Sequence, residues 1–166
     1  MEIKVVDNFL PVFELEALQQ VIMHHNFPWY YTPTVAVKNI VKDQPWNWYQ
    51  THCFYTNNQP DGPHYPYVSS FFLPRFKDLK SLIRIKANFY PHTETLKEHL
   101  THTDFDFKHT AAIFSLNTCD GFTRMEDGSI VRSVANRMVF FDGSTPHNSS
   151  TLTSDSARLN INFNYI

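Results

Sequence analysis

The sequence is poor in cysteine, and this excludes two classes of small protein. Its 166 residues include only Cys53 and Cys119, which lie far apart in the chain. Such a pair forms neither a zinc ladder, which needs closely spaced ligands, nor the dense disulfide framework of small secreted domains. We therefore expect two free thiols in a reducing compartment.

An excess of positive charge is also missing. Fourteen Lys and Arg residues oppose sixteen Asp and Glu residues, which leaves a formal net charge of −2 at pH 7. A protein that binds nucleic acid or a membrane surface by electrostatics alone is normally far more basic. The charge balance therefore argues against nucleic acid as a partner.

Long hydrophobic runs are absent as well. The longest apolar runs span only a few residues, whereas a helix needs about 20 apolar residues to cross a bilayer. Residues 1–7 lack the apolar stretch of a signal peptide. We expect a cytoplasmic protein without a membrane partner.

Repeats, low-complexity tracts and long linkers are missing too, so we expect residues 1–166 to form one domain. Core material is abundant, because 42% of the residues are hydrophobic and 15 are Phe. Proline and apolar spacing divide the first half of the chain into recognisable segments. These are a strand over 3–6, a helix from Pro11 to before Pro28, aromatic loops and short strands over 27–67, and a proline-interrupted helix over 68–82.

After residue 82 the pattern changes to alternation, which is typical of strands. The predicted strands cover residues 83–90, 111–116, 130–134, 138–141 and 159–165, and three of the four glycines (Gly121, Gly128 and Gly143) lie in turns between them. This order predicts an α+β fold with a double-stranded β-helix core, also called a jelly roll or cupin-like fold. Residues 1–82 would supply the flanking helices and aromatic loops, and residues 83–166 the core.

Nine histidines are many for this length, and two of them suggest a metal site. His102 and Asp104 lie at positions i and i+2, so an extended backbone places both side chains on one face. Imidazole and carboxylate are the ligands of a 2-His-1-carboxylate facial triad. The third ligand would come from His147, which follows a predicted strand and has no obvious role in the core. His99 and His109 are competing ligand candidates, but neither has a carboxylate at i+2.

The last predicted strand has one polar and one apolar face. The polar face carries Arg158, Asn160, Asn162 and Asn164. If the apolar face packs on the helices, this row points into the barrel, where it is costly unless polar groups meet it. The alternative is an edge strand with a solvated polar face.

The order of these motifs resembles that of the Fe(II)- and 2-oxoglutarate-dependent oxygenases. The resemblance covers roughly residues 84–166 and is closest to small prolyl 4-hydroxylase-like members from bacteria and phages. His102-x-Asp104, His147 and Arg158 occur in the order of that family. The segment Asn88-Phe89-Tyr90-Pro91 lies upstream of them, as an Asn-x-Tyr pair does in several branches.

Two positions differ from the prolyl hydroxylase pattern. Asp120 replaces the first Gly of a Gly-Gly-x-Thr turn, and Arg158 stands where those proteins often have Lys. The Arg158-x-Asn160 pairing resembles that of the AlkB-like nucleic-acid dealkylases. The resemblance therefore leaves the subfamily open.

The resemblance implies a set of residue roles. His102, Asp104 and His147 would hold Fe(II) and leave three positions for 2-oxoglutarate and O2. The cosubstrate would contact Arg158, Tyr90, Asn88 and Asn160, with the Arg158 guanidinium on its distal carboxylate. The implied function is that of a dioxygenase, an oxidoreductase that hydroxylates a peptide or small molecule and releases succinate and CO2.

Two other functions compete with this one. A non-catalytic cupin-like module would use the same cavity to hold a sugar or a structural metal. A nucleic-acid dealkylase would use a cluster of basic residues to bind phosphates. This cluster consists of Arg75, Lys77, Lys80, Arg84 and Lys86, and such clusters are more often a solvated face.

The aromatic residues of the first half allow two interpretations. They form either a lid over the site or, as we favour, part of the core on the helical side, and they are Trp29, Tyr30, Trp46, Trp48 and Tyr49. Asp106 either supports the site or is a solvated loop residue, and we favour the second.

Overall fold

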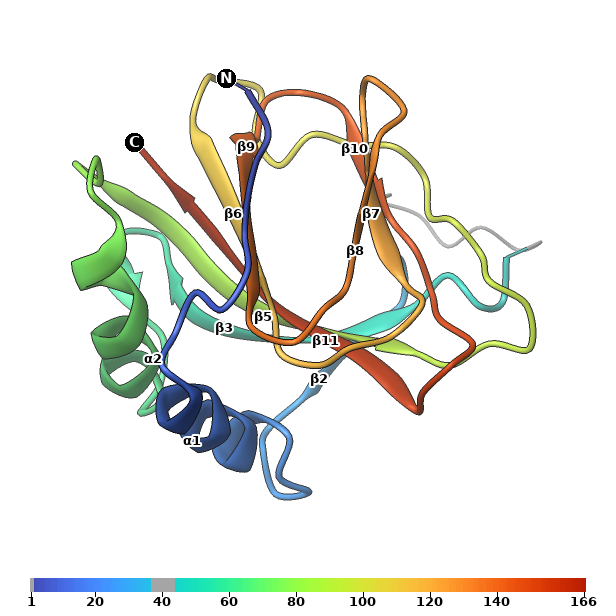
Figure 1. Ribbon diagram of the computed structural model, residues 1–166, viewed down its shortest axis with the longest axis horizontal. Coiled ribbons are helices and arrows are strands. Elements are labelled where there is room, and N and C mark those ends of the chain that lie inside the picture. Colours follow the sequence, from blue (N-terminus) through green and yellow to red (C-terminus); the bar gives the residue numbers. More distant parts are fainter. Residues whose placement is uncertain (1, 37–43) are drawn as a thin grey trace.

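The computed structural model describes residues 2–36 and 44–166 (Figure 1). Two α-helices, one short 3-10 helix and eleven strands are formed by these residues. The helical segments are α1 (Val12–Ile22), α2 (Tyr65–Phe72) and η1 (Leu73–Arg75). The strands of the first half are β1 (Lys4–Val6), β2 (Tyr30–Thr32), β3 (Tyr49–Thr56) and β4 (Gln59–Pro60). Those of the second half are β5 (Leu82–Pro91), β6 (Thr110–Ser115), β7 (Phe122–Met125), β8 (Ile130–Arg132), β9 (Arg137–Asp142), β10 (His147–Ser149) and β11 (Ala157–Tyr165).

The strands form two antiparallel sheets. The large sheet has the order β1-β9-β6-β11-β5-β3-β2, with β4 added beside β3, and the small sheet has the order β10-β7-β8. In Figure 1 the small sheet stands opposite the β6–β9 part of the large sheet, and β5 and β11 close the space between them below. This is the predicted double-stranded β-helix with flanking helices, so the fold class is confirmed.

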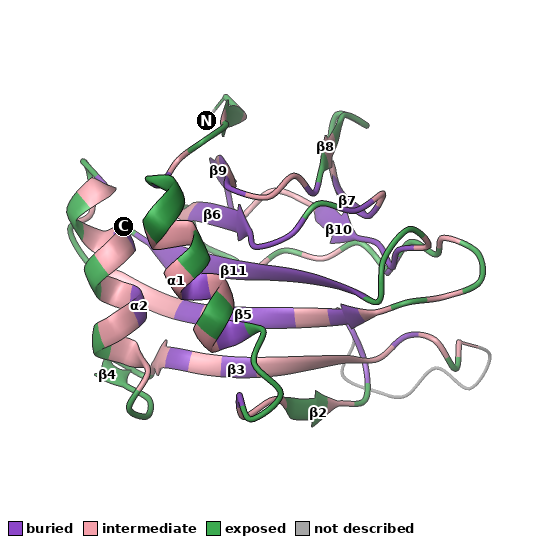
Figure 2. Ribbon diagram, turned by 60° about the horizontal axis from the view of Figure 1, so that its bottom comes forward, coloured by how far each residue is buried: buried purple, intermediate pink, exposed green. Residues whose placement is uncertain are grey.

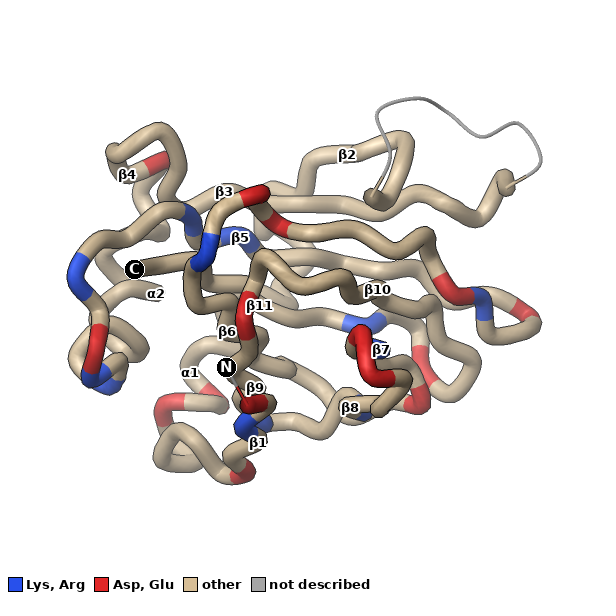
Figure 3. Tube along the Cα trace, turned by 90° about the horizontal axis from the view of Figure 1, so that it is seen from above, with Lys and Arg blue, Asp and Glu red and all other residues tan. Residues whose placement is uncertain are grey.

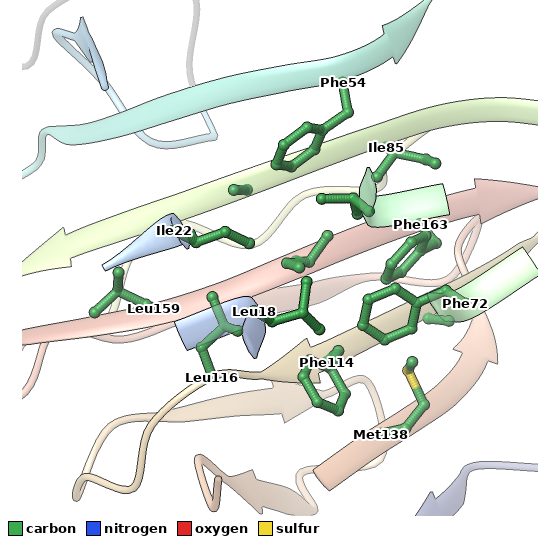
Figure 4. Packing of buried hydrophobic residues seen from close by; sticks show 14 of the residues in the cluster. Leu18, Ile22, Phe54, Phe72, Ile85, Phe114, Leu116, Met138, Leu159 and Phe163 are labelled. Carbon is green, nitrogen blue, oxygen red and sulfur yellow. The ribbon is translucent and has the colours of Figure 1, made fainter. Parts of the chain in front are cut away.

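The hydrophobic core lies between the helices and the outer face of the large sheet (Figures 2 and 4). Leu18 and Ile22 of α1 and Phe72 of α2 are fully buried there. The ring centroid of Phe72 lies 4.9 Å from that of Phe114 on β6 and 4.7 Å from that of Phe163 on β11. The helices therefore cover the apolar face of β11, and its polar face turns toward the small sheet.

The alternative of a solvated edge strand for residues 159–165 is wrong. Strand β11 pairs with β5 on one side and with β6 on the other, so it lies in the interior of the sheet. Its polar side chains Arg158, Asn160, Asn162 and Asn164 are all buried. Partners for this polar row must therefore come from inside the barrel.

Several elements differ from the sequence prediction. The aromatic region contains the eight-residue strand β3, which adds to the large sheet beside β5. Strands β7 and β10 were not predicted, and the second helix ends at Phe72 before the 3-10 turn at Pro74. No helix in residues 2–36 and 44–166 is long and apolar enough to cross a membrane. Cys53 and Cys119 are free thiols, as predicted.

Candidate active site

His102, Asp104 and His147 meet inside the barrel, although strands β6 to β9 lie between the first two residues and the third along the chain. His102 and His147 form a two-residue bridge in which each backbone N–H donates to the other's carbonyl at 2.9 Å. The backbone N–H of Asp104 donates to the carbonyl of Gly143 at 3.0 Å, which anchors the loop a second time. One ligand atom from each of the three side chains lies within 4.8 Å of the other two.

Both histidines are oriented by backbone carbonyls. Nδ1 of His102 lies 3.4 Å from the carbonyl oxygen of Leu100, and Nδ1 of His147 lies 3.0 Å from that of Thr145. A carbonyl only accepts, so Nδ1 carries the proton in each ring and Nε2 keeps a lone pair. Burial, followed by the neighbouring His147, lowers the pKa of His102 to about 4. His102 is therefore neutral at pH 7, as metal ligation requires.

The Asp104 carboxylate receives hydrogen bonds from two neighbouring strands. Arg84 Nη2 on β5 donates to Oδ1 at 2.7 Å, and Asn164 Nδ2 on β11 donates to Oδ2 at 2.8 Å. Asn162 Nδ2 adds a longer contact of 3.2 Å to Oδ2. Burial alone would raise the pKa of Asp104, but Arg84, His147 and the two amides outweigh it and lower that pKa below its ordinary value. The carboxylate is ionised and held in one orientation.

Arg158 is buried in the same cavity, and its hydrogen-bond partners are uncharged. Its Nε donates to Ser133 Oγ at 2.6 Å and its Nη2 to Thr123 Oγ1 at 2.9 Å, and its guanidinium carbon lies 5.3 Å from the ring centre of Tyr90. No carboxylate among the described residues forms an ion pair with it. Gly121 leaves the space for this side chain, since a Cβ there would lie 2.8 Å from Arg158 Cδ. A buried guanidinium without a counter-ion is costly and is typical of an anion site.

A cavity of about 390 Å³ joins these groups. All seven residues that the sequence singled out line it, namely His102, Asp104, His147, Arg158, Tyr90, Asn88 and Asn160. Asn88 and Asn160 bond to each other, with Asn88 Nδ2 donating to Asn160 Oδ1 at 2.8 Å. Asn88 Oδ1 is buried without a hydrogen-bond partner among the described residues. The Tyr90 ring stacks on that of Tyr49 at 5.6 Å.

Four polar residues received no role in the site from the sequence. Asn162 and Asn164 orient Asp104, and Arg84 and Lys86 line the cavity rather than belonging to one solvated basic cluster. The only signal in the sequence was alternation, and the sheet register gives it meaning. Arg84 and Lys86 alternate with apolar residues on β5, directly opposite Asn164 and Asn162 on β11.

The remaining candidates take structural positions. His99 Nδ1 bonds to Ser149 Oγ at 2.9 Å, and His109 Nε2 accepts from Asn164 at 3.2 Å, so neither joins the three clustered side chains. Asp106 is exposed. Of the aromatic residues, Trp29 packs on the core as favoured, Tyr49 lines the cavity instead, and Tyr30 is exposed.

Solved structures that share this double-stranded β-helix fold include prolyl hydroxylases and a 2OG-Fe(II) oxygenase family protein. A prolyl-4-hydroxylase from Pseudomonas putida is 20% identical, with a TM-score of 0.65 over 98% of this chain and 91% of that one. A prolyl hydroxylase from Trichoplax adhaerens, solved with a hypoxia inducible factor peptide, is 15% identical, with a TM-score of 0.64 over 99% and 83%. A 2OG-Fe(II) oxygenase family protein from Burkholderia pseudomallei is 10% identical, with a TM-score of 0.67 over 98% and 84%.

The likeness lies in the fold. No family model matches the sequence, and no curated protein is similar to it. Function must therefore be argued from the residues of the site, because one fold supports many reactions.

Proposed function

We propose that this protein is an Fe(II)- and 2-oxoglutarate-dependent dioxygenase that hydroxylates a peptide or small molecule. The observation that carries the proposal is the combination, in one cavity, of a His-Asp-His cluster and a buried guanidinium without a counter-ion among the described residues. The cluster offers the ligands of non-haem Fe(II), and the guanidinium offers a partner for a dicarboxylic cosubstrate. Neither feature alone would distinguish an enzyme from a binding module.

The donor set fits a ferrous ion. Nε2 of His102 and of His147 and one oxygen of Asp104 would hold it on one face. Oδ2 of Asp104 accepts from both Asn164 and Asn162, whereas Oδ1 accepts a short bond from Arg84 and has only a 3.4 Å contact with Asn162, so Oδ1 is the oxygen better able to offer a lone pair to the metal. When bound, the ion and 2-oxoglutarate supply oxidation by dioxygen, with release of succinate and CO2 and hydroxylation of the substrate.

The protein's own contribution is positioning. The Arg158 fork would bind the distal carboxylate of the cosubstrate, and Ser133 and Thr123 hold that fork in place. The ring of Tyr90 covers the guanidinium and excludes water from it. Asn88 Oδ1 faces no partner among the described residues and is an acceptor at the same site.

The binding spectrum tests this proposal directly. Anaerobic addition of Fe(II) and 2-oxoglutarate to the protein should produce a visible metal-to-ligand charge-transfer band, and admission of oxygen should then yield succinate. Asp104→Ala should abolish both signals because it removes one ligand. Asp106→Ala is the matched control, since this exposed carboxylate lies two residues away and should leave both signals intact.

A colourless protein would identify a cupin-like binding module instead. A band that persists undiminished in Asp104→Ala would show that the ligand assignment is wrong. The basic cluster gives the dealkylase alternative less support, because Arg84 and Lys86 line the cavity and Arg75 pairs with Glu14, whereas the Arg158-x-Asn160 pairing remains. The positions of Lys and Arg are also interspersed with those of Asp and Glu along the described trace (Figure 3).

A further inference from the structure

Lys86 is a second, partly buried cation in the cavity, and the proposed function does not use it. Its Nζ donates to the Tyr49 hydroxyl at 3.4 Å and lies 5.3 Å from the centre of the Tyr49 ring. No carboxylate of the described residues forms an ion pair with it, and the nearby Asp104 pairs with Arg84. Burial, with the charge of Arg84 second, lowers the pKa of Lys86 to about 8. Lys86 is therefore a partly buried ammonium group without a counter-ion among the described residues.

The charge balance of the cavity also indicates a site for an anionic ligand. Its described lining includes three cationic side chains, Arg84, Lys86 and Arg158, and a single carboxylate, Asp104. A divalent ferrous ion and a dicarboxylic cosubstrate would cancel each other and leave this surplus unchanged. Two positive charges therefore remain for a further ligand, and an uncompensated interior charge is costly.

Lys86 lies at the end of the cavity away from Arg158. Arg158 is opposite Tyr90 in the sheet, whereas Lys86 is opposite Asn162, which contacts Asp104. The two rungs are four residues apart, which corresponds to roughly 13 Å along the strands. A cosubstrate whose far carboxylate meets Arg158 would have its other end at the His-Asp-His cluster, and Lys86 lies on the rung beside that cluster rather than on the rung of Arg158.

We propose that Lys86 and the Tyr49 hydroxyl form a subsite for a carboxylate of the primary substrate, an inference that rests on the proposed dioxygenase function. One ammonium group and one phenol offer two donors, which match the two oxygens of a carboxylate. The cavity of about 390 Å³ is shared with the cosubstrate, so the group that enters it is small. It is either a free carboxylic acid or an acidic side chain of a peptide.

The test compares acids with their uncharged amides. The probes are N-acetyl-L-amino acids with their primary amides, and terminally blocked tetrapeptides that contain either Glu or Gln. Calorimetry on the anaerobic Fe(II)–2-oxoglutarate protein measures each affinity for the parent, for Lys86→Met and for Tyr49→Phe. Lys80→Met is the matched control, because Lys80 is exposed and remote from the cavity lining.

Acids should bind more tightly than their amides, and Lys86→Met should weaken acid binding by about 10- to 100-fold, as expected for a charged hydrogen bond. Tyr49→Phe should weaken acid binding less, and the affinities for amides and for 2-oxoglutarate should stay unchanged in both variants. The two probe sets distinguish a free acid from an acidic side chain.

Equal binding of acids and amides would overturn the proposal. So would a Lys86→Met variant that loses affinity for 2-oxoglutarate, because Lys86 would then belong to the cosubstrate site. If the charge-transfer band is missing, the dioxygenase function fails separately. The same acid–amide pairs are then titrated on the metal-free protein, where the preference for acids that depends on Lys86 must still be present.

Discussion

Buried charges define this site at the scale of single residues. Arg84 has a carboxylate partner in Asp104, whereas Arg158 and Lys86 have none among the described residues. The paired cation orients Asp104, the proposed metal ligand, and the two unpaired cations are available for ligands. Paired and unpaired cations differ in whether the side chain reaches a carboxylate, and the residue type alone does not reveal this difference.

Arg158 should determine the choice of cosubstrate without affecting metal binding. Arg158→Ala should weaken 2-oxoglutarate binding by roughly 30- to several-thousand-fold, since breaking a buried charge pair costs about 2–5 kcal/mol. Fe(II) affinity should stay nearly unchanged, because Arg158 is not in the His-Asp-His cluster. Titration of each ligand, followed by the charge-transfer band, measures both.

Two controls separate a carboxylate contact from general damage. Arg158→Lys keeps a positive charge and should lose less affinity than Arg158→Ala. A monocarboxylic 2-oxo acid lacks the distal carboxylate, so its affinity should change little in either variant. An Arg158→Ala protein that binds 2-oxoglutarate as tightly as the parent would contradict the assignment.

At the scale of elements, the turn between β6 and β7 explains the Asp that replaces a Gly of the prolyl hydroxylase pattern. The Asp120 carboxylate accepts from the backbone N–H of Thr153 at 2.9 Å and from its hydroxyl at 2.5 Å, and also from the backbone and hydroxyl of Ser154. The turn is thereby tied to the loop that precedes β11. This loop determines where β11 begins, and Arg158 is the second residue of that strand.

Asp120 should make the protein acid-sensitive. Burial alone would raise the pKa of Asp120, but the bonds from Thr153 and Ser154 outweigh it and lower that pKa to about 2. Since the pKa is lower in the folded state than in the unfolded state, the stabilisation is complete above about pH 4 and is lost as the pH falls from 4 toward 2. Denaturant unfolding at pH 7 and at pH 3 should show this loss.

Asp120→Asn should reduce stability at pH 7 by about 1–2 kcal/mol, because a weaker acceptor replaces an ionised one. The decline between pH 4 and pH 2 should become shallower in this variant. Asp106→Asn changes an exposed carboxylate in the same way and should leave the pH dependence as it is in the parent. Parallel pH profiles of Asp120→Asn and the parent would contradict this role.

At the scale of the whole molecule, the site joins the two sheets. The His102–His147 bridge connects the segment after β5 to β10 of the small sheet, while Asp104 is held by β5 and β11 of the large sheet. A metal bound by all three side chains would therefore link both sheets and the loop between them. Binding should stabilise the fold as a whole.

Fe(II) with 2-oxoglutarate should raise the melting temperature of the anaerobic protein. Ligand at 100 times its dissociation constant adds about 2.7 kcal/mol, and each kcal/mol shifts the midpoint by about 2–4 °C for a domain of this size, so a rise of roughly 5–10 °C is expected. Calorimetric melting of His102→Ala should show little of this rise. His24→Ala removes an exposed histidine and should keep the whole rise; an equal rise in both variants would show that His102 is not a ligand.

The sequence determined the large-scale features because they depend on local periodicity. Alternation places Leu159, Ile161 and Phe163 on one face of the last strand, and the helices do cover that face. The spacing of His102 and Asp104 and the order of the later motifs identified the residues that the fold gathers into one cavity. The structure confirms the jelly-roll fold and the two free thiols.

Only the tertiary structure decided which polar groups meet. Strand β3 was hidden because its aromatic sequence has no clear alternation, and it becomes a strand by pairing with β5. Asp104 lies 20 residues from Arg84 and 60 from Asn164, and their contact depends on the pairing of β5 with β11. Lys86 lines the cavity for the same reason, since the sheet register places it between Cys53 of β3 and Asn162 of β11, within reach of the Tyr49 hydroxyl. Local patterns carry no information about such long-range registers, and for this reason the basic residues of β5 resemble a solvated face until the sheet is assembled.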